Sequence, residues 1–219
     1  MRINFIKNDK NYGIQFSLSK LVSLAEKNHS IGIFLGQDDM LSRNYVKEMI
    51  KIFQDPKLVF AYSVLKSFNS TNFDKPKFIV PINLNILGKF KTALLLHGNY
   101  ITSPGVTFRL RNFPGKLIEG TPNLLHDWAQ FLWMHLDGTF KISYKTNVHY
   151  RIHSNQTTKI EKIGLKEIEE MRYKFVTSKK FQSWFSKLNS PSRIVFYVIL
   201  KVLDVNKTTS LIVVKNLAR

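Results

Sequence analysis

The spacing of apolar residues predicts alternating helices and strands over the first 65 residues. Apolar side chains recur every three or four positions over residues 14–25 and 46–53, which predicts two amphipathic helices. Continuous apolar runs at 31–35 and 58–65 are typical of short strands that are buried on both faces. Residues 2–6 read as a further short strand. This order predicts an α/β fold with a mostly parallel sheet and helices on both faces.

The pattern is less regular beyond residue 65. Residues 66–100 are rich in Asn, Lys and Pro, so we expect a loop and a short helix there. A strand is expected at 106–110, and a helix at 124–136 with Gly138 ending it. Residues 148–153 then alternate strictly, which indicates a strand with Val148, Tyr150 and Ile152 on its apolar face and with His149, Arg151 and His153 on the opposite face.

Two adjacent carboxylates follow the buried strand at 31–35. Asp38 and Asp39 stand in a turn, where ligands of α/β sheets bind beyond the carboxyl ends of strands. Paired carboxylates are ligands that Mg²⁺ and Mn²⁺ prefer, and such ions are commonly shared with a substrate diphosphate. The alternative is a solvated turn that begins the next helix. The sequence leaves both interpretations open.

Three other segments are candidates for chemistry. Asp127 is either a general base toward a hydroxyl group or a first-turn acid that the helix dipole stabilises. Arg151 and His153 either bind a diphosphate or a metal, or lie on an exposed edge strand. The segment Gly98–Gly105 either lines an acceptor pocket, with glycines that permit close approach, or is a plain connection.

Charge and composition narrow the classes of function. The chain of 219 residues contains no cysteine, which excludes disulfides, thiol catalysis and Cys-ligated zinc. Its net charge is +18, which favours polyanionic partners such as nucleic acid, anionic lipid or nucleotide diphosphates. Residues 156–219 hold 13 Lys/Arg and 5 Asp/Glu, and we expect residues 159–219 to form a basic, mainly helical extension. We see no signal peptide and no membrane span, so a cytoplasmic location is expected.

The order of the motifs resembles the family 2 glycosyltransferases of the GT-A fold, which are inverting enzymes of bacterial surface polysaccharide synthesis. Four segments carry the resemblance, which covers about residues 3 to 158: Asn11-Tyr12-Gly13-Ile14, Ile33 to Asp39, Leu125-His126-Asp127-Trp128, and Tyr150 to Asn155. They look like the family's Asn-x-Gly element, its strand and DXD-type motif, its Glu-Asp-Trp element and its Tyr-Arg-x-His ending. The resemblance implies a truncated catalytic domain at residues 1–158.

The resemblance also implies roles for single residues. Asp38 and His153 would hold Mn²⁺ or Mg²⁺, and Asp127 would deprotonate the acceptor hydroxyl. The nucleotide-sugar donor, with UDP favoured, would be bound by Asn11, Gly13, Asp39 and Arg151. The acceptor would be a saccharide or a lipid-linked saccharide, so we expect contact with the inner face of the plasma membrane.

The sequence departs from the family pattern in three places. Gly36 and His126 stand where the family has acids, and its first two strands are absent. We therefore expect the isolated chain to bind nucleotide weakly and to turn over slowly. Two alternatives remain: a non-catalytic membrane-surface protein, and a nucleic-acid-binding protein, although the chain lacks a recognised nucleic-acid motif.

Overall fold

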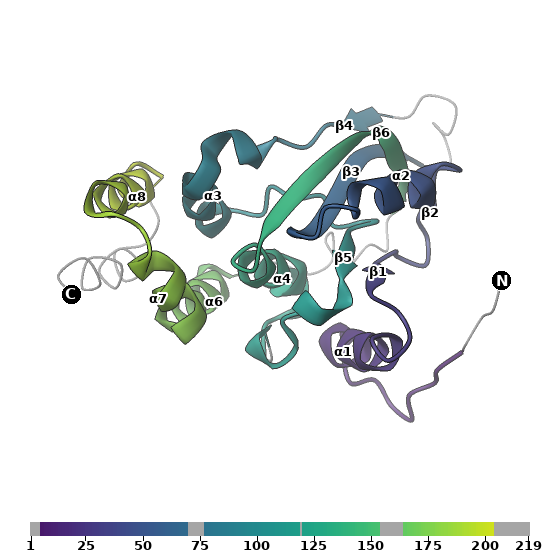
Figure 1. Ribbon diagram of the computed structural model, residues 1–219. Coiled ribbons are helices and arrows are strands. Elements are labelled where there is room, and N and C mark those ends of the chain that lie inside the picture. The colour runs from purple at the N-terminus through teal and green to yellow at the C-terminus, as the bar shows by residue number, and fades with distance from the viewer. Residues whose placement is uncertain (1–4, 70–76, 119, 154–163, 204–219) are drawn as a thin grey trace.

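The computed structural model describes residues 5–69, 77–118, 120–153 and 164–203, which form helices and strands around one mixed sheet (Figure 1). The strands are β1 (Ile31–Ile33), β2 (Met40–Leu41), β3 (Leu58–Phe68), β4 (Lys77–Ile79), β5 (Thr107–Arg109) and β6 (Thr139–Arg151). The α-helices are α1 (Ile14–Ala25), α2 (Tyr45–Ile52), α3 (Lys91–His97), α4 (His126–Met134), α6 (Leu165–Thr177), α7 (Lys179–Ser186) and α8 (Ser190–Val202). Short 3₁₀ turns are η1 (Leu84–Phe90), η2 (Leu110–Asn112), η3 (Gly115–Ile118) and η4 (Asn123–Leu125).

The sheet has the order β1-β5-β3-β6-β2, with β4 paired to β3. β3 and β6 pair in parallel, whereas the other described pairs are antiparallel. The expectation of a mostly parallel sheet was therefore wrong, although the α/β class is confirmed. The reason is that β5, which the sequence placed correctly near 106–110, runs back between β1 and β3 and pairs antiparallel with both.

Two hydrophobic cores lie on opposite faces of the sheet, so the prediction of helices on both faces is confirmed. On one face α2 buries Tyr45 and Met49 against Ala61 and Val148. On the other face α3 and α4 pack on the sheet around Phe60, as part of the larger core. Alternation along β3 explains the division, because successive side chains of a strand point to opposite faces.

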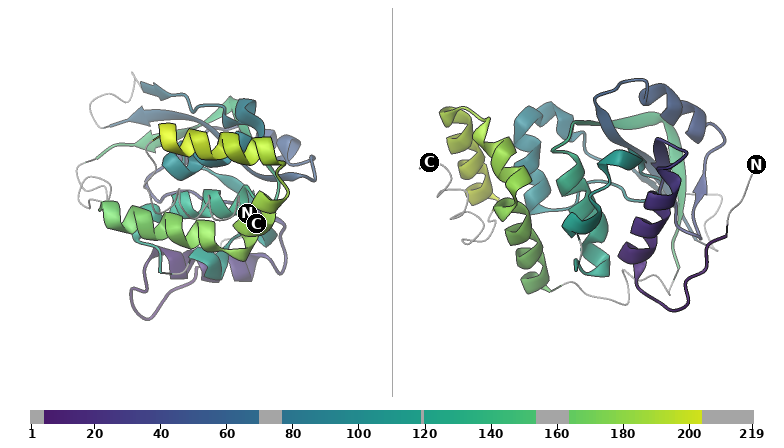
Figure 2. Two further views of the ribbon diagram at one scale, coloured as in Figure 1. Left: turned by 90° about the vertical axis from the view of Figure 1, so that its left-hand side faces the viewer. Right: turned by 60° about the horizontal axis from the view of Figure 1, so that its bottom comes forward.

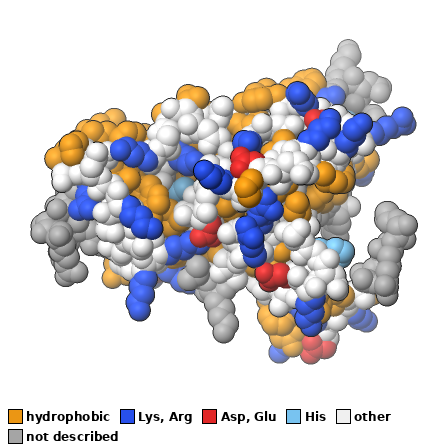
Figure 3. Space-filling view, in the orientation of Figure 1, with side chains coloured by type: hydrophobic (Ala, Val, Ile, Leu, Met, Phe, Trp, Pro, Cys, Tyr) orange, Lys and Arg blue, Asp and Glu red, His pale blue; other side chains and the backbone are white. Residues whose placement is uncertain are grey.

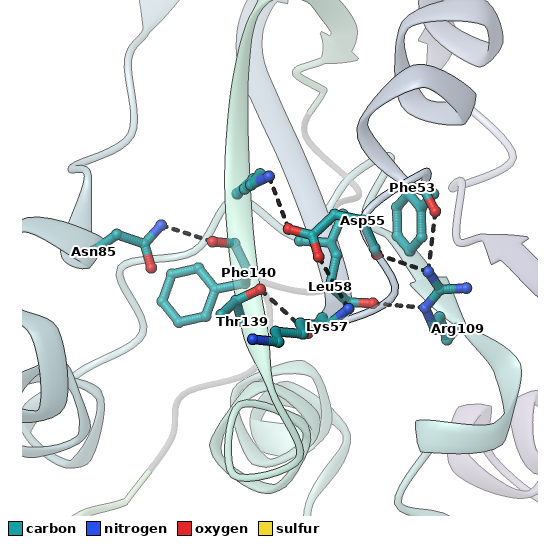
Figure 4. Close-up of polar contacts among 9 residues, drawn as sticks. Phe53, Asp55, Lys57, Leu58, Asn85, Arg109, Thr139 and Phe140 are labelled. Atoms are coloured by element: carbon teal, nitrogen blue, oxygen red, sulfur yellow. Dashed lines mark hydrogen bonds and ion pairs between the residues drawn. The ribbon is translucent and has the colours of Figure 1, made fainter.

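Arg109 fastens β5 to the neighbouring strand. Its Nε donates to the carbonyl oxygen of Leu58 at 2.7 Å, and one terminal nitrogen donates to the carbonyls of Phe53 and Asp55 at 3.0 and 2.9 Å. Figure 4 shows the guanidinium pointing from β5 into this turn between α2 and β3. A charged fork therefore satisfies three backbone acceptors at the end of a helix and the start of a strand.

The helical character expected after residue 158 is seen in α6, α7 and α8. Figure 2 shows these helices as a layer against the body of the molecule. Their aromatic side chains Phe175, Phe181, Phe185 and Phe196 belong to the same core as Phe131 of α4. Within the described residues, no helix combines the length and the apolarity that crossing a bilayer requires.

The predicted strand at residues 2–6 lies partly outside the described residues, and Phe5 and Ile6 belong to no strand. The short helix expected within residues 66–100 is α3. The rest of this region contains a strand pairing that was not expected, because β3 continues to Phe68 and pairs with β4. The last strand is also longer than expected, since β6 begins at Thr139 rather than near 148.

Candidate functional site

The turn that carries Asp38 and Asp39 is held just beyond the end of β1. Phe34 continues the strand, since its N–H donates to the carbonyl of Val106 and its carbonyl accepts from the N–H of Gly105, at 2.9 and 2.8 Å. The N–H of Asp39 then donates to the carbonyl of Gly36 at 3.3 Å, which closes a tight turn. The backbone hydrogen bonds of Phe34 to residues 105 and 106 thus fix the start of the turn.

Gly36 leaves room for both carboxylates beside it. A Cβ built at Gly36 would lie 2.9 Å from Oδ2 of Asp39 and 3.2 Å from Oδ1 of Asp38. The carboxylates therefore fold back over the position where the resembled family has its first acid. Any side chain at position 36 would have to displace these flexible carboxylates.

The end of β6 meets this turn from the other side. Nε2 of His153 lies 2.7 Å from Oδ2 of Asp38, although 115 positions separate the two residues. The backbone N–H of Arg151 donates to Oδ1 of Asp39 at 3.1 Å. The structure thus brings together four of the residues that the sequence singled out, from two segments far apart in the chain.

The two carboxylates differ in environment. Burial raises the pKa of Asp39, and the nearby negative charge of Asp38 raises it further, whereas the hydrogen bond from the Arg151 backbone opposes the rise. The Asp38 and His153 side chains are 36% and 39% exposed, so a ligand in solvent can reach both. Asp38 is therefore accessible from solvent on the side where it meets His153.

The metal-ligating side chains of this cluster fit a cation that is shared with a substrate better than a cation that protein ligands hold alone. Within the described residues, no group of three or more His, Cys, Asp or Glu side chains is arranged to hold a metal. Asp38 and His153 together offer a carboxylate oxygen and an imidazole nitrogen side by side. Two protein ligands suit Mg²⁺ or Mn²⁺ when substrate phosphates and water complete the coordination.

Asp127 lies at the start of α4, where three donors hold its carboxylate. The N–H of Trp128 donates to Oδ1 at 2.7 Å. The hydroxyl of Ser103 and the amide of Asn99 donate to Oδ2, the latter at 3.4 Å. The segment Gly98–Gly105 therefore contacts Asp127 through Asn99 and Ser103.

The two halves of the site are joined through Phe34 and Gly105. The ring of Phe34 lies edge-on to that of His126, the neighbour of Asp127, with centroids 6.2 Å apart. Gly105 pairs with Phe34 through its backbone and accepts a hydrogen bond from the buried hydroxyl of Tyr45. The Asp38 turn and the Asp127 segment are therefore neighbours, connected by side-chain and backbone contacts.

Asn11 and Gly13 lie elsewhere. The side chain of Asn11 accepts from the N–H of Gly13 at 2.9 Å, just before α1. Gly13 lines a cavity of about 800 Å³ between α1 and residues 110–121. Phe16 and Arg111 also line this cavity. Asp38, Asp39 and Arg151 do not line that cavity, so the described structure does not bring Asn11 and Gly13 into the Asp38 cluster.

Sequence reasoning missed three contributors. Ser103 and Asn99 were noted only as parts of a glycine-bracketed segment, and Tyr45 was not singled out, since the helix was expected to begin at residue 46. Their partners are between 24 and 60 positions away, so local pattern carried no sign of the pairing. The polar residues between Gly98 and Gly105 were the one available signal.

No protein-family model matches this chain, and no curated protein matches it.

Proposed function

We propose that the chain is a glycosyltransferase of the nucleotide-sugar type, which transfers a sugar to a saccharide or lipid-linked acceptor. The observation that carries the proposal is the contact between Asp38 and His153. These residues belong to two of the four segments on which the resemblance to family 2 glycosyltransferases rests. The antiparallel pairing of β2 with β6 brings these two segments together, and the contact places a carboxylate and an imidazole side by side, as the proposed site requires.

The GT-A fold is part of the same proposal. It is supported by the α/β architecture, by the cores on both faces of the sheet, and by the position of the Asp38 turn beyond a strand end. Ligands of α/β sheets bind in this position. The mixed pairing of the strands is compatible with this class of fold but does not single it out.

The Asp38 cluster would bind the diphosphate of the donor. Asp38 and His153 would hold a divalent cation, which neutralises negative charge on the leaving phosphate when it is bound. Arg151 would contribute a cation, since its positive charge opposes the rise that burial causes in the pKa of the Asp39 carboxyl, while its guanidinium lies over the ring of Phe68 at 5.5 Å. Asp39 would stay in place through its hydrogen bond from the Arg151 backbone.

Asp127 would act as the general base. It would take the proton of the acceptor hydroxyl while the new bond forms to the anomeric carbon and the bond to the phosphate oxygen breaks. Three donors fix the orientation of its carboxylate. Inversion at the anomeric carbon is implied by the resemblance and follows from a single displacement.

A calorimetric titration with UDP, with and without Mn²⁺, tests the donor half of the proposal. We expect weak binding that requires the metal and that disappears in Asp38→Ala. The matched control is Glu170→Ala, because Glu170 is an acid on α6 whose side chain is 68% exposed. Binding that ignores the metal or the Asp38 substitution would refute this site, as would a folded chain that binds no nucleoside diphosphate.

The acceptor half is tested by Asp127→Asn. Removal of a general base lowers the rate of transfer by roughly 10²–10⁴-fold. Nucleotide binding should persist, because the hydrogen bonds described for Asp127 lead to Ser103, Asn99 and Trp128 and not to the Asp38 cluster. Transfer to a panel of saccharide acceptors is the readout, and unchanged transfer in Asp127→Asn would remove this residue from the mechanism.

A further inference from the structure

Helix α8 is apolar on both of its long faces. Ser192, Phe196 and Leu200, four positions apart, are buried against the core. The opposite face exposes the apolar side chains Ile194, Val195, Val198 and Val202. A surface helix normally presents polar residues to water on its outer face. The outer face of α8 therefore has the character of a contact surface.

The segment from β4 to η1 exposes a second set of apolar side chains. Phe78, Val80, Ile82 and Ile86 are between 55% and 78% exposed. η1 contacts α3, and α3 contacts α8, so α3 connects the elements that carry the two sets. Figure 3 shows orange side chains along the upper border of the molecule, over α8 and over β4. We call these eight residues, four from each set, the apolar border.

The two segments of the chain that carry the apolar border are rich in lysine and arginine. Residues 171–203 contain seven Lys/Arg and no Asp/Glu, and residues 77–97 contain three Lys and no Asp/Glu. Lys201 is exposed on α8 itself, and Nζ of Lys66 lies 5.1 Å from the ring centroid of Phe78. Two of these cations, Arg172 and Lys180, pair with Glu169 and Asp137, and the others leave an excess of positive charge in these segments. Apolar side chains with an excess of cations complement an anionic surface with an apolar interior.

We propose that the apolar border docks the protein on a membrane surface rich in anionic lipid. The aliphatic side chains would enter the boundary between headgroups and acyl chains, while the lysines reach the headgroups. A nucleic acid offers the charge without the apolar layer, and so fits the exposed valines and isoleucines poorly. The proposal goes beyond the transferase assignment and does not depend on it.

Co-sedimentation with vesicles is the direct test. We expect binding to vesicles of equal parts phosphatidylglycerol and phosphatidylcholine, weakening with added salt, and little binding to pure phosphatidylcholine. Val198→Glu should lower the partition coefficient by roughly tenfold or more, because it replaces methyl groups that docking would bury in the bilayer with a negative charge that the anionic headgroups repel. The matched control is Val46→Glu on α2, since Val46 and Val198 are 50% and 49% exposed.

A second pair of variants tests the electrostatic part. Lys201→Glu should weaken binding by at least about fivefold, since each cation near an anionic surface contributes about that factor. Lys47→Glu, an exposed lysine on α2, should have a smaller effect. If Val198→Glu fails to fold, as judged by circular dichroism, Val202→Glu replaces it, because Val202 is 79% exposed.

Three results would overturn the proposal: no binding to anionic vesicles, equal effects of the variant and its control, or a change of oligomeric state in Val198→Glu without a change in vesicle binding. The last would assign this surface to a second copy of the chain. Asp38→Ala should bind vesicles normally, so failure of the transferase proposal and failure of this one are separable.

Discussion

Gly105→Ala is the substitution that most sharply tests the geometry of the site. Gly105 has a φ of +77°, in the left-handed region that glycine favours. A Cβ at this position would overlap Cγ2 of Val148 and would lie 3.2 Å from the hydroxyl oxygen of Tyr45. Val148 and Tyr45 are both completely buried, so neither can move aside into solvent.

The expected cost has two parts. An L-residue in the left-handed region costs about 1–2 kcal/mol. Overpacking against a buried side chain typically adds about 1–3 kcal/mol. The free energy of unfolding should therefore fall by roughly 2–5 kcal/mol, which is a large share of the stability of an ordinary domain.

Gly120→Ala separates the two parts. Gly120 has a φ of +78°, almost the same as Gly105, but a Cβ there meets no atom within 4 Å. We expect this variant to lose only the backbone part, about 1–2 kcal/mol. Urea unfolding followed by tryptophan fluorescence measures both variants. Equal losses in the two would refute the close packing of Gly105 against Val148 and Tyr45.

Three further predictions concern the scaffold. Arg109→Lys should cost about 2–4 kcal/mol in unfolding free energy, because an ammonium group cannot satisfy three separate carbonyls; the exposed Arg111, changed in the same way, should cost much less. Burial, aided by the charge of Lys91, lowers the pKa of His135 to about 3, so the unfolded state binds a proton below pH 6.5 that the folded state does not. Stability should therefore fall by about 2 kcal/mol from pH 6.5 to pH 5, and His135→Asn, unlike a change at the exposed His29, should flatten this dependence in urea titrations. Tyr45→Phe should cost about 1–2 kcal/mol by chemical unfolding, because it removes a buried donor to the carbonyl of Gly105, whereas an unchanged stability would mean that solvent or another group replaces the hydroxyl.

The sequence predicted local elements well where apolar spacing was strong. The helix at 14–25 and the strands near 31–35 and 58–65 are present, and the alternation at 148–153 places Val148 inside and Arg151 outside. The sequence pattern could not predict the direction of strand pairing, since a strand of three residues such as β5 shows the same kind of pattern in a parallel and in an antiparallel pair. Register and direction are set by contacts between segments that are distant along the chain.

The candidate site was predictable in part. Asp38 and His153 were identified as ligands of a common partner, and they are in contact. The partners of Asp127 were not identified, because the sequence does not show whether a carboxylate on a helix and a serine in a distant loop lie close together in the fold. Asn11 and Gly13 were assigned to the same nucleotide sugar, but the structure places Gly13 at the cavity beside α1, with Asn11 hydrogen-bonded to it. That assignment stays a prediction.

The contact between Asp38 and His153 also bears on how the chain folds. The pair closes a loop of more than a hundred residues, and the entropy lost on closure grows with loop length. Contacts of such high sequence separation form late, after local helices and hairpins have reduced the search. The cluster lies next to the pairing of β2 with the end of β6, so it forms when these two strands pair. A ligand bound there would stabilise this pairing between distant segments rather than a single loop.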